Sequence, residues 1–355
     1  MTTLIGVAPA QAPSIDDVVA RMSLREKVGQ LVMFSVNGTG LTSHEREVIR
    51  DAHLGSVIIF AKNYDDRTQL AALTAQIQAS VGRGNRDGIG ALISADQEGG
   101  VVKRFPDMPP AYSAPRMGEI NDPVVAFNEG RSTGRAMAEA GVNIDLAPVA
   151  DLDLPPHHIM RDRSFGASRY RVARLAKAFG KGLQARGVAA TAKHFPGLGG
   201  ATLNTDDGRA QVNRTKRELH DIDAVPFKAA VNGDFKLVML SHAIYPNDGG
   251  GRPASVNRYI ASKRLRGELG FEGVAISDAL EAVAWKFDGN VPAACTATIK
   301  AGVDLALITG NVDVARACAN SIREAVRVGE ISFDRLNRAV ARVLELKSWL
   351  GLIPS

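Results

Sequence analysis

The sequence has few cysteines and no long apolar run. Only Cys295 and Cys318 occur in 355 residues, and both fall in stretches with helical patterning. We therefore expect two small buried apolar side chains, rather than a disulfide or a pair of metal ligands. No stretch approaches the roughly 18 apolar residues that a membrane span needs. The sequence thus predicts neither a disulfide framework nor a membrane-spanning chain.

Clusters of one charge are also missing. The 43 Lys and Arg residues and 38 Asp and Glu residues are mixed along the chain, giving a formal net charge of +5. Aromatic residues make up 5% of the chain and do not alternate with basic residues. We find no basic run of five or more. This pattern argues against nucleic-acid binding.

The first 14 residues, MTTLIGVAPAQAPS, lack the positive segment and the long apolar run of a signal peptide. We expect residues 1–14 to be a disordered leader and the protein to be cytoplasmic. The sequence gives no indication of oligomeric state.

The chain does contain a repeated pattern of short apolar runs followed by helical stretches. The runs are too continuously apolar for half-exposed strands and are typical of a parallel sheet covered by helices. Eight such runs occur, at 30–36, 55–61, 90–96, 142–151, 188–194, 236–243, 273–279 and 303–309.

Helical patterns separate these runs, for example at 67–81, 124–141 and 169–187. Ser23 and Glu26 form a capping-box pattern at the start of another helix. Eight strands alternating with helices predict an α/β fold, a (β/α)8 TIM barrel. No linker divides the chain, so we expect residues 15–355 to form one domain.

Titratable residues follow several of the predicted strands, where barrel enzymes place their active sites. They are Asp96, Glu98, Asp151, Asp153, Lys193, His194, His242 and Asp278, with Arg104 and Arg163 in the loops just beyond. No histidine spacing suggests a metal site, and we expect no cofactor.

Each of these residues also has a structural interpretation. Asp278 is either a nucleophile or charge stabiliser, or the cap of a helix that begins at Ala279. Asp96 and Arg104 either grip sugar hydroxyls or form a structural ion pair. Lys193 is either a Schiff-base lysine or a hydrogen-bond donor to a polar substrate. For His242 we favour a structural role over a catalytic one.

Several motifs together resemble glycoside hydrolase family 3, in particular its single-domain β-N-acetylglucosaminidases. The matching pieces occur in family order from about residue 23 to 352. They include SLREKVGQLVMF, ADQEGGVVKRF, NIDLAPVADLD, RDRSFG, AKHFPGLG, LSHAIYP and LGFEGVAISDALE. The resemblance implies a retaining exo-β-glycosidase acting on a small-molecule N-acetylglucosaminide or related amino sugar. It makes Asp278 the nucleophile, and the matching sugar-binding residues are Asp96, Arg104, Arg163, Lys193 and His194, to which we add His242.

The loop after the fifth run departs from this family. The family's glucosaminidases read KHFPGHGDxxxDSH, and their last histidine is the acid/base, paired with the aspartate two residues before it. This chain reads KHFPGLGGATLNTDD. Leu198 replaces the first loop histidine, Asn204 replaces the paired aspartate, and Asp206 stands in place of the catalytic histidine.

Three explanations stay open. In the first, Asp206 or Asp207 serves as acid/base, with a raised pKa. In the second, the substrate has a leaving group that needs little protonation, as in specialised metabolism, or supplies its own acid. In the third, the protein binds sugar without cleaving it. Glu281, one helical turn after Asp278, is a further candidate acid. A Schiff-base lyase using Lys193 is a distant alternative.

Overall fold

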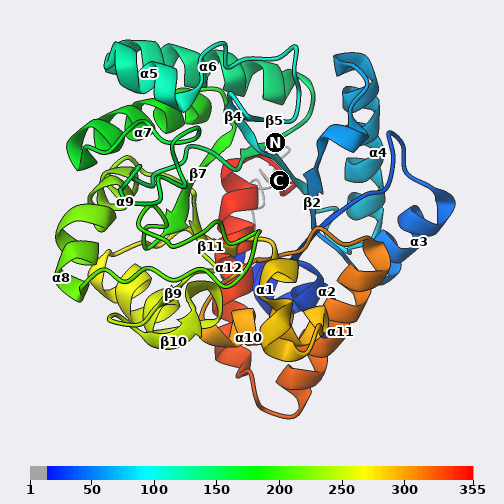
Figure 1. Ribbon diagram of the computed structural model, residues 1–355. Helices are drawn as coiled ribbons and strands as arrows, with labels where there is room; N and C mark the ends of the chain where they lie inside the picture. Colours follow the sequence, from blue (N-terminus) through cyan, green and yellow to red (C-terminus); the bar gives the residue numbers. More distant parts are fainter. Residues whose placement is uncertain (1–13, 355) are drawn as a thin grey trace, which may run out of the picture.

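Eight parallel strands form a nearly closed barrel in the centre of the computed structural model, which describes residues 14–354 (Figure 1). The strands are β1 (Val32–Ser35), β2 (Ser56–Ile59), β3 (Leu92–Ala95), β6 (Ile144–Asp145), β7 (Ala189–Phe195), β8 (Leu237–Leu240), β11 (Val274–Ser277) and β12 (Ala306–Leu307). Their order is β11-β8-β7-β6-β3-β2-β1-β12. A parallel bridge between Ile276 and Leu305 joins the two edges. The predicted (β/α)8 barrel is confirmed.

Each of the eight predicted apolar runs coincides with one barrel strand, although β7 extends one residue further, to Phe195, and every residue of these strands is buried. This burial agrees with the continuous apolar character of the runs. Helices cover the outer face of the barrel and side chains fill its interior, so both faces of each strand exclude water.

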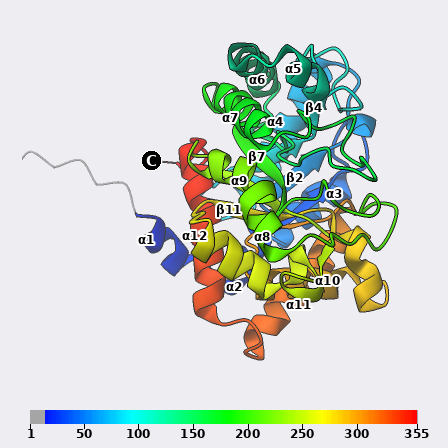
Figure 2. The same ribbon diagram turned by 60° about the vertical axis from the view of Figure 1, so that its left-hand side comes forward.

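Helices surround the strands on all sides (Figures 1 and 2). They are α1 (Ile15–Arg21), α2 (Leu24–Gly29), α3 (Ser43–Asp51), α4 (Arg67–Arg83), α5 (Ala114–Ile120), α6 (Pro123–Glu139), α7 (Arg169–Gln184), α8 (Lys216–Glu218), α9 (Ala224–Val231), α10 (Val291–Ala301), α11 (Val312–Arg327) and α12 (Phe333–Trp349). Figure 2 shows α1 next to α12, so the two ends of the described chain pack together.

Shorter elements complete the chain. They are the 3-10 helices η1 (Ala61–Asn63), η3 (Ala254–Val256) and η5 (Leu280–Phe287), the π-helices η2 (Leu219–Asp223) and η4 (Tyr259–Glu268), and the paired strands β4 (Gln97–Gly99) with β5 (Val102–Lys103) and β9 (Ile244–Tyr245) with β10 (Gly250–Pro253).

The helix starts follow the capping chemistry of the sequence. Ser23 accepts a hydrogen bond from the Glu26 N–H, and Glu26 accepts one from the Ser23 N–H, which confirms the predicted capping box. Ser14 caps α1 in the same way. The leader expected at 1–14 therefore ends in a structured residue, and its residues 1–13 lie outside the described part of the chain.

The expectation for the two cysteines is wrong. Cys295 on α10 and Cys318 on α11 form a disulfide, with their Cα atoms 5.8 Å apart. Both side chains are fully buried, as expected. The pairing depends on how α10 and α11 pack against each other, and a sequence pattern does not give the register of two neighbouring helices.

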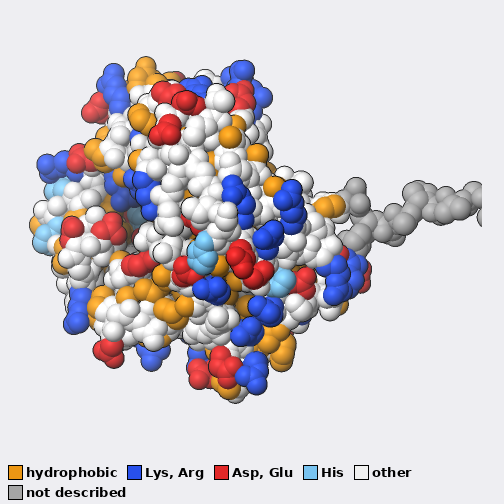
Figure 3. Space-filling view, turned by 90° about the vertical axis from the view of Figure 1, so that its right-hand side faces the viewer, with side chains coloured by type: hydrophobic (Ala, Val, Ile, Leu, Met, Phe, Trp, Pro, Cys, Tyr) orange, Lys and Arg blue, Asp and Glu red, His pale blue; other side chains and the backbone are white. Residues whose placement is uncertain are grey.

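Charges of both signs are interspersed on the face shown in Figure 3, with small apolar patches between them. Among the described residues, no helix combines the length and the apolar character needed to cross a membrane.

Candidate active site

A pocket of about 210 Å³ opens where the barrel strands end. The carboxyl ends of β3, β7 and β11 place Asp96, Lys193, His194 and Asp278 around it, as barrel geometry predicts. Seven of the nine predicted site residues line the pocket: Asp96, Arg104, Arg163, Lys193, His194, Asp206 and Asp278. Asp207 and His242 do not.

One side of the pocket is a network of alternating charges. Lys193 Nζ lies 2.7 Å from both Asp96 Oδ1 and Glu98 Oε1. Arg163 donates to both Glu98 oxygens, from Nη2 at 2.7 Å and from Nε at 3.0 Å. Arg104 Nη2 donates to Asp96 Oδ2 at 3.2 Å. Two carboxylates and three cations thus form one continuous set of fixed donors and acceptors.

These contacts decide the protonation states. Burial alone would raise the pKa of Glu98, but Lys193 and Arg163 lower it to about 2. Burial alone would lower the pKa of Lys193, but Asp96 and Glu98 raise it above its ordinary value. A Schiff-base lysine needs a neutral, unpaired amine, and Lys193 is charged and doubly paired. The paired, charged Lys193 argues against the lyase alternative.

Asp278 lies opposite His194 at the end of β11. Its Oδ1 accepts the N–H of Ala279 at 2.8 Å, and its Oδ2 lies 3.9 Å from His194 Nε2. Burial alone would raise the pKa of Asp278, but His194 and the Ala279 N–H bring it below its ordinary value. Asp278 is therefore an ionised carboxylate facing a pocket, although it is not the side-chain cap of a regular helix.

Asp151 holds His194 in place from below. Its Oδ2 accepts a hydrogen bond from His194 Nδ1 at 2.6 Å and from the His194 N–H at 3.0 Å, and its Oδ1 accepts the Leu198 N–H at 2.7 Å. Because a carboxylate only accepts, Nδ1 carries the proton and Nε2 is the nitrogen that faces Asp278.

The loop from 196 to 215 brings Asn204, Thr205 and Asp206 to the pocket wall. Asp206 is exposed to solvent, yet the charge of Asp278 acts on its carboxyl group. Partial burial, and then the negative charge of Asp278, raise the pKa of Asp206 above its ordinary value. Leu198 is buried against the pocket, where it can neither donate nor accept a proton.

His242 and Glu281 have other partners. His242 Nε2 donates to the Ala279 carbonyl and Nδ1 contacts Ser255 Oγ, both at 2.7 Å, so neither ring nitrogen is free to bind a sugar. Burial lowers the pKa of His242, which favours the neutral ring. Glu281 Oε1 accepts the N–H groups of Thr309 and Gly310, and Glu281 does not line the pocket.

Sequence reasoning left three acidic residues out of the predicted site. The sequence places Glu98 and Asp151 at strand ends. It does not show that Glu98 pairs with Lys193 or that Asp151 orients His194, because these contacts join different loops. Asp145 is fully buried on β6, and its Oδ2 has no hydrogen-bond partner. Burial raises the pKa of Asp145 to about 8. The only signal for Asp145 in the sequence was an acid within an apolar run.

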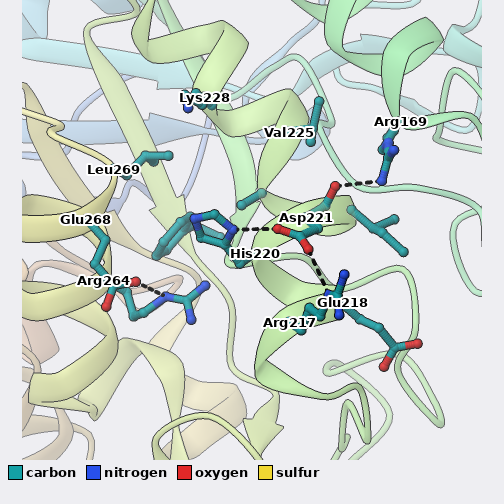
Figure 4. Close-up of a pocket in the computed structure, with 13 residues that line it drawn as sticks. Arg169, Arg217, Glu218, His220, Asp221, Val225, Lys228, Arg264, Glu268 and Leu269 are labelled. Atoms are coloured by element: carbon teal, nitrogen blue, oxygen red, sulfur yellow. Dashed lines mark hydrogen bonds and ion pairs between the residues drawn. The ribbon is translucent and has the colours of Figure 1, made fainter.

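A larger cavity of about 600 Å³ lies elsewhere, between η2, α9 and η4 (Figure 4). Several of its polar groups already pair with one another. Asp221 accepts from His220 Nδ1 at 2.8 Å and from Arg217 Nε at 3.3 Å, and its carbonyl accepts from Arg169 at 2.7 Å. None of the predicted catalytic or binding residues lines this cavity. Among the described residues, no cluster of His, Cys, Asp and Glu could hold a metal ion.

A barrel with an ionised carboxylate and a dense set of charged hydrogen-bonding groups at its strand ends defines an enzyme for a small polar substrate. The comparison with known proteins makes this class specific. The model of the glycosyl hydrolase family 3 N-terminal domain matches residues 23–346, and the chain belongs to this family of glycoside hydrolases.

Curated relatives and solved structures agree with this family. The chain is 34% identical to a beta-hexosaminidase of Bordetella avium, over 86% of this chain and 87% of that protein. It is 32% identical to an uncharacterized secreted glycosyl hydrolase of Arthroderma benhamiae, over 96% and 98%.

The structure is similar to a family 3 beta-N-acetylglucosaminidase from Paenibacillus, with a TM-score of 0.88 and 32% identity; the match covers 93% of this chain but only 63% of that one. A beta-N-acetylhexosaminidase from Beutenbergia cavernae gives a TM-score of 0.84 at 29% identity, over 93% of this chain and 99% of that one.

Proposed function

We propose that this protein is a retaining exo-β-glycosidase for β-N-acetylglucosaminides or related amino sugars, with Asp278 as nucleophile and Asp206 as acid/base. One observation carries the assignment: Asp278 and Asp206 line the same pocket and their pKa values are shifted in opposite directions. Two carboxyl groups with separated pKa values are what a glycosidase needs. Asp207 does not line the pocket, which favours Asp206 over its neighbour.

The chemistry then follows from these two groups. Asp278 attacks the anomeric carbon, and Asp206 gives its proton to the leaving oxygen as the glycosidic bond breaks. In the second half, Asp206 takes a proton from water while the water attacks the glycosyl–Asp278 ester. This route requires the two carboxyl groups to come within about 5–5.5 Å with substrate bound.

The remaining charged groups suit a sugar. Asp96, Arg104, Arg163 and Lys193 offer fixed acceptors and donors to sugar hydroxyls, and their mutual pairing keeps them in place. The choice of an N-acetylated amino sugar rests on relatives that carry the names beta-hexosaminidase and beta-N-acetylglucosaminidase.

The test compares two β-N-acetylglucosaminides between pH 4 and 9. One carries a dinitrophenyl leaving group, which needs no proton, and the other a methyl group, which does. Cleavage of both supports a working acid. Cleavage of the dinitrophenyl substrate alone means that Asp278 works but that no protein group protonates an ordinary leaving group. Cleavage of neither contradicts the proposal and favours a sugar-binding protein or a different sugar.

Two substitutions assign the roles. Asp278→Asn should lower turnover of both substrates at least about a thousandfold, because no covalent intermediate forms. Asp206→Asn should lower kcat/KM of the methyl glycoside about 10²–10⁴-fold and kcat/KM of the dinitrophenyl glycoside far less, because kcat/KM reports the first step and that step needs no acid for this leaving group. The kcat of the dinitrophenyl glycoside should still fall, since Asp206 is also the base that activates water in the second half. Asp206→Asn should also remove the alkaline limb of the pH profile, since that limb reports loss of the acid's proton. Asp207→Asn is the matched control and should leave both substrates close to wild type.

A further inference from the structure

The loop that carries Asp206 is fastened firmly at its base. At Gly199 a Cβ atom would lie 1.7 Å from the carbonyl oxygen of Leu152, so the backbone there packs directly on the neighbouring loop. Further along, the Thr202 N–H donates to the Gln211 carbonyl at 3.0 Å, and Ala201 pairs with Val212 in an antiparallel bridge. The two segments that form the base of the loop are therefore held by backbone contacts.

The tip of the loop, residues 203–209, has weaker support. In the described part of the chain, the hydrogen bonds of residues 204–207 stay within the tip: the Asp206 N–H donates to Asn204 Oδ1 at 3.3 Å, and the Asp207 N–H donates to the Asn204 carbonyl at 3.1 Å. These bonds shape the turn. Leu203 packs against the apolar core and Thr205 is buried, so packing holds the first part of the tip, whereas Asp206 and Asp207 are exposed. A contact on the far side of Asp206 would complete the support of the tip.

One side chain of the tip contacts the segment that follows Asp278. The guanidinium carbon of Arg209 lies 4.1 Å from the ring centroid of Trp285. Trp285 is on η5, the 3-10 helix that starts two residues after Asp278. The contact therefore joins the loop bearing Asp206 to the segment that directly follows Asp278. An arginine over an indole face at this distance is a favourable cation–π pair.

We propose that Arg209 and Trp285 form a clasp that positions Asp206 over Asp278 for proton transfer. This inference rests on the proposed function, because it assigns Asp206 the acid role. Arg209 and Trp285 are positioning residues, since neither lines the pocket. The side chain two residues before Asp206, Asn204, accepts a hydrogen bond from the Asp206 N–H and forms no hydrogen bond with the Asp206 carboxyl group. The contact between Arg209 and Trp285 therefore takes over the task of positioning Asp206.

The kinetic test uses the two glycosides described above. Arg209→Ala and Trp285→Ala should each slow the methyl glycoside about tenfold or more, because a small displacement of the acid costs much of its effect. The kcat/KM of the dinitrophenyl glycoside should change less than about twofold, since the step that kcat/KM reports needs no acid for this leaving group. Arg209→Lys and Trp285→Phe keep a cation and an aromatic ring and should restore most of the activity. The double alanine variant should be no slower than either single one.

Lys286→Ala is the matched control. Lys286 is adjacent to Trp285 in the chain and its Nζ lies 5.9 Å from the same ring, but it is not on the loop. This variant should behave as wild type. An equal loss with both glycosides in Arg209→Ala, or no loss with either, would overturn the clasp.

A second readout does not depend on turnover. Amide hydrogen exchange of residues 203–209 should accelerate in Arg209→Ala and in Trp285→Ala but not in Lys286→Ala. Unchanged exchange in both clasp variants overturns the proposal even if the wild type cleaves neither glycoside. The two proposals also fail separately. If Asp206→Asn leaves cleavage of the methyl glycoside unchanged, the acid role is refuted. If Asp206→Asn slows this cleavage and Arg209→Ala does not, only the clasp is refuted.

Discussion

At the scale of single residues, the carboxyl groups around the pocket have protonation states set by their nearest neighbours. Glu98 touches two cations and its pKa falls to about 2. Asp145 receives one backbone N–H and has an unpartnered oxygen, and burial raises its pKa to about 8. Asp206, at the pocket wall, has a pKa raised by partial burial and by the charge of Asp278. The same end of the barrel thus holds carboxyl groups with lowered pKa values and carboxyl groups with raised pKa values.

The substitution Glu98→Gln should destabilise the protein. It leaves Arg163 without its carboxylate partner in a buried network. The pKa of Glu98 is about 2 in the folded protein and about 4.5 ordinarily, a difference that corresponds to about 3 kcal/mol at pH 7. Because the folded pKa is depressed, this stabilisation is complete above pH 4.5 and disappears as the pH falls through 2.

Urea unfolding between pH 7 and 3 measures this difference. The gap between wild type and Glu98→Gln should be largest at pH 7 and should shrink steadily below about pH 4.5. Glu119→Gln removes an exposed i,i+3 ion pair with Arg116 and should cost less than about 1 kcal/mol. A pH-independent gap would show that Glu98 acts through packing rather than charge.

At the scale of elements, the active-site loop depends on a close approach of two backbones. Gly199→Ala would place a methyl group against the Leu152 carbonyl, which cannot move without shifting the segment that holds Asp151. We expect loss of turnover with both glycosides, because His194 and Asp206 are displaced together. Gly38→Ala, where a Cβ meets no atom within 4 Å, is the control and should keep wild-type activity. An active Gly199→Ala variant would show that the loop base tolerates displacement.

The disulfide ties two neighbouring helices. The Cys295–Cys318 link closes a segment with a sequence separation of 23, for which chain entropy predicts a stabilisation of about 3 kcal/mol. Reductant should therefore lower the Tm of wild type and leave the Tm of a Cys295→Ala/Cys318→Ala variant unchanged. A Tm of wild type that ignores reductant would contradict this prediction. Structural disulfides are most common in oxidising compartments. The Cys295–Cys318 link therefore does not favour the cytoplasmic location expected from the sequence, and that location stays a prediction.

At the scale of the whole molecule, the barrel and much of its site could be predicted from local sequence patterns. Continuous apolar runs specify buried strands, and a polar residue at the end of such a run, like Asp278, has to lie at the barrel mouth. What could not be predicted involves pairs of distant elements. The Cys295–Cys318 link and the contact of Arg209 with Trp285 depend on how helices and loops meet in space, and no sequence period reports that.

Lys347 joins the C-terminal helix α12 to the segments around Gln30 and Gly55, and its burial makes stability depend on pH. This fully buried residue of α12 donates from Nζ to Gln30 Oε1 at 2.6 Å and to the Gly55 carbonyl at 3.1 Å. Burial lowers its pKa from 10.5 to about 7. Between these values the unfolded chain binds a proton that the folded protein does not, so stability should rise with pH. Relative to Lys347→Met, wild type should gain about 2 kcal/mol in unfolding free energy from pH 7 to 9. Lys300→Met, at an exposed position, should follow wild type. Parallel pH curves for wild type and Lys347→Met would mean that Lys347 stays charged when buried.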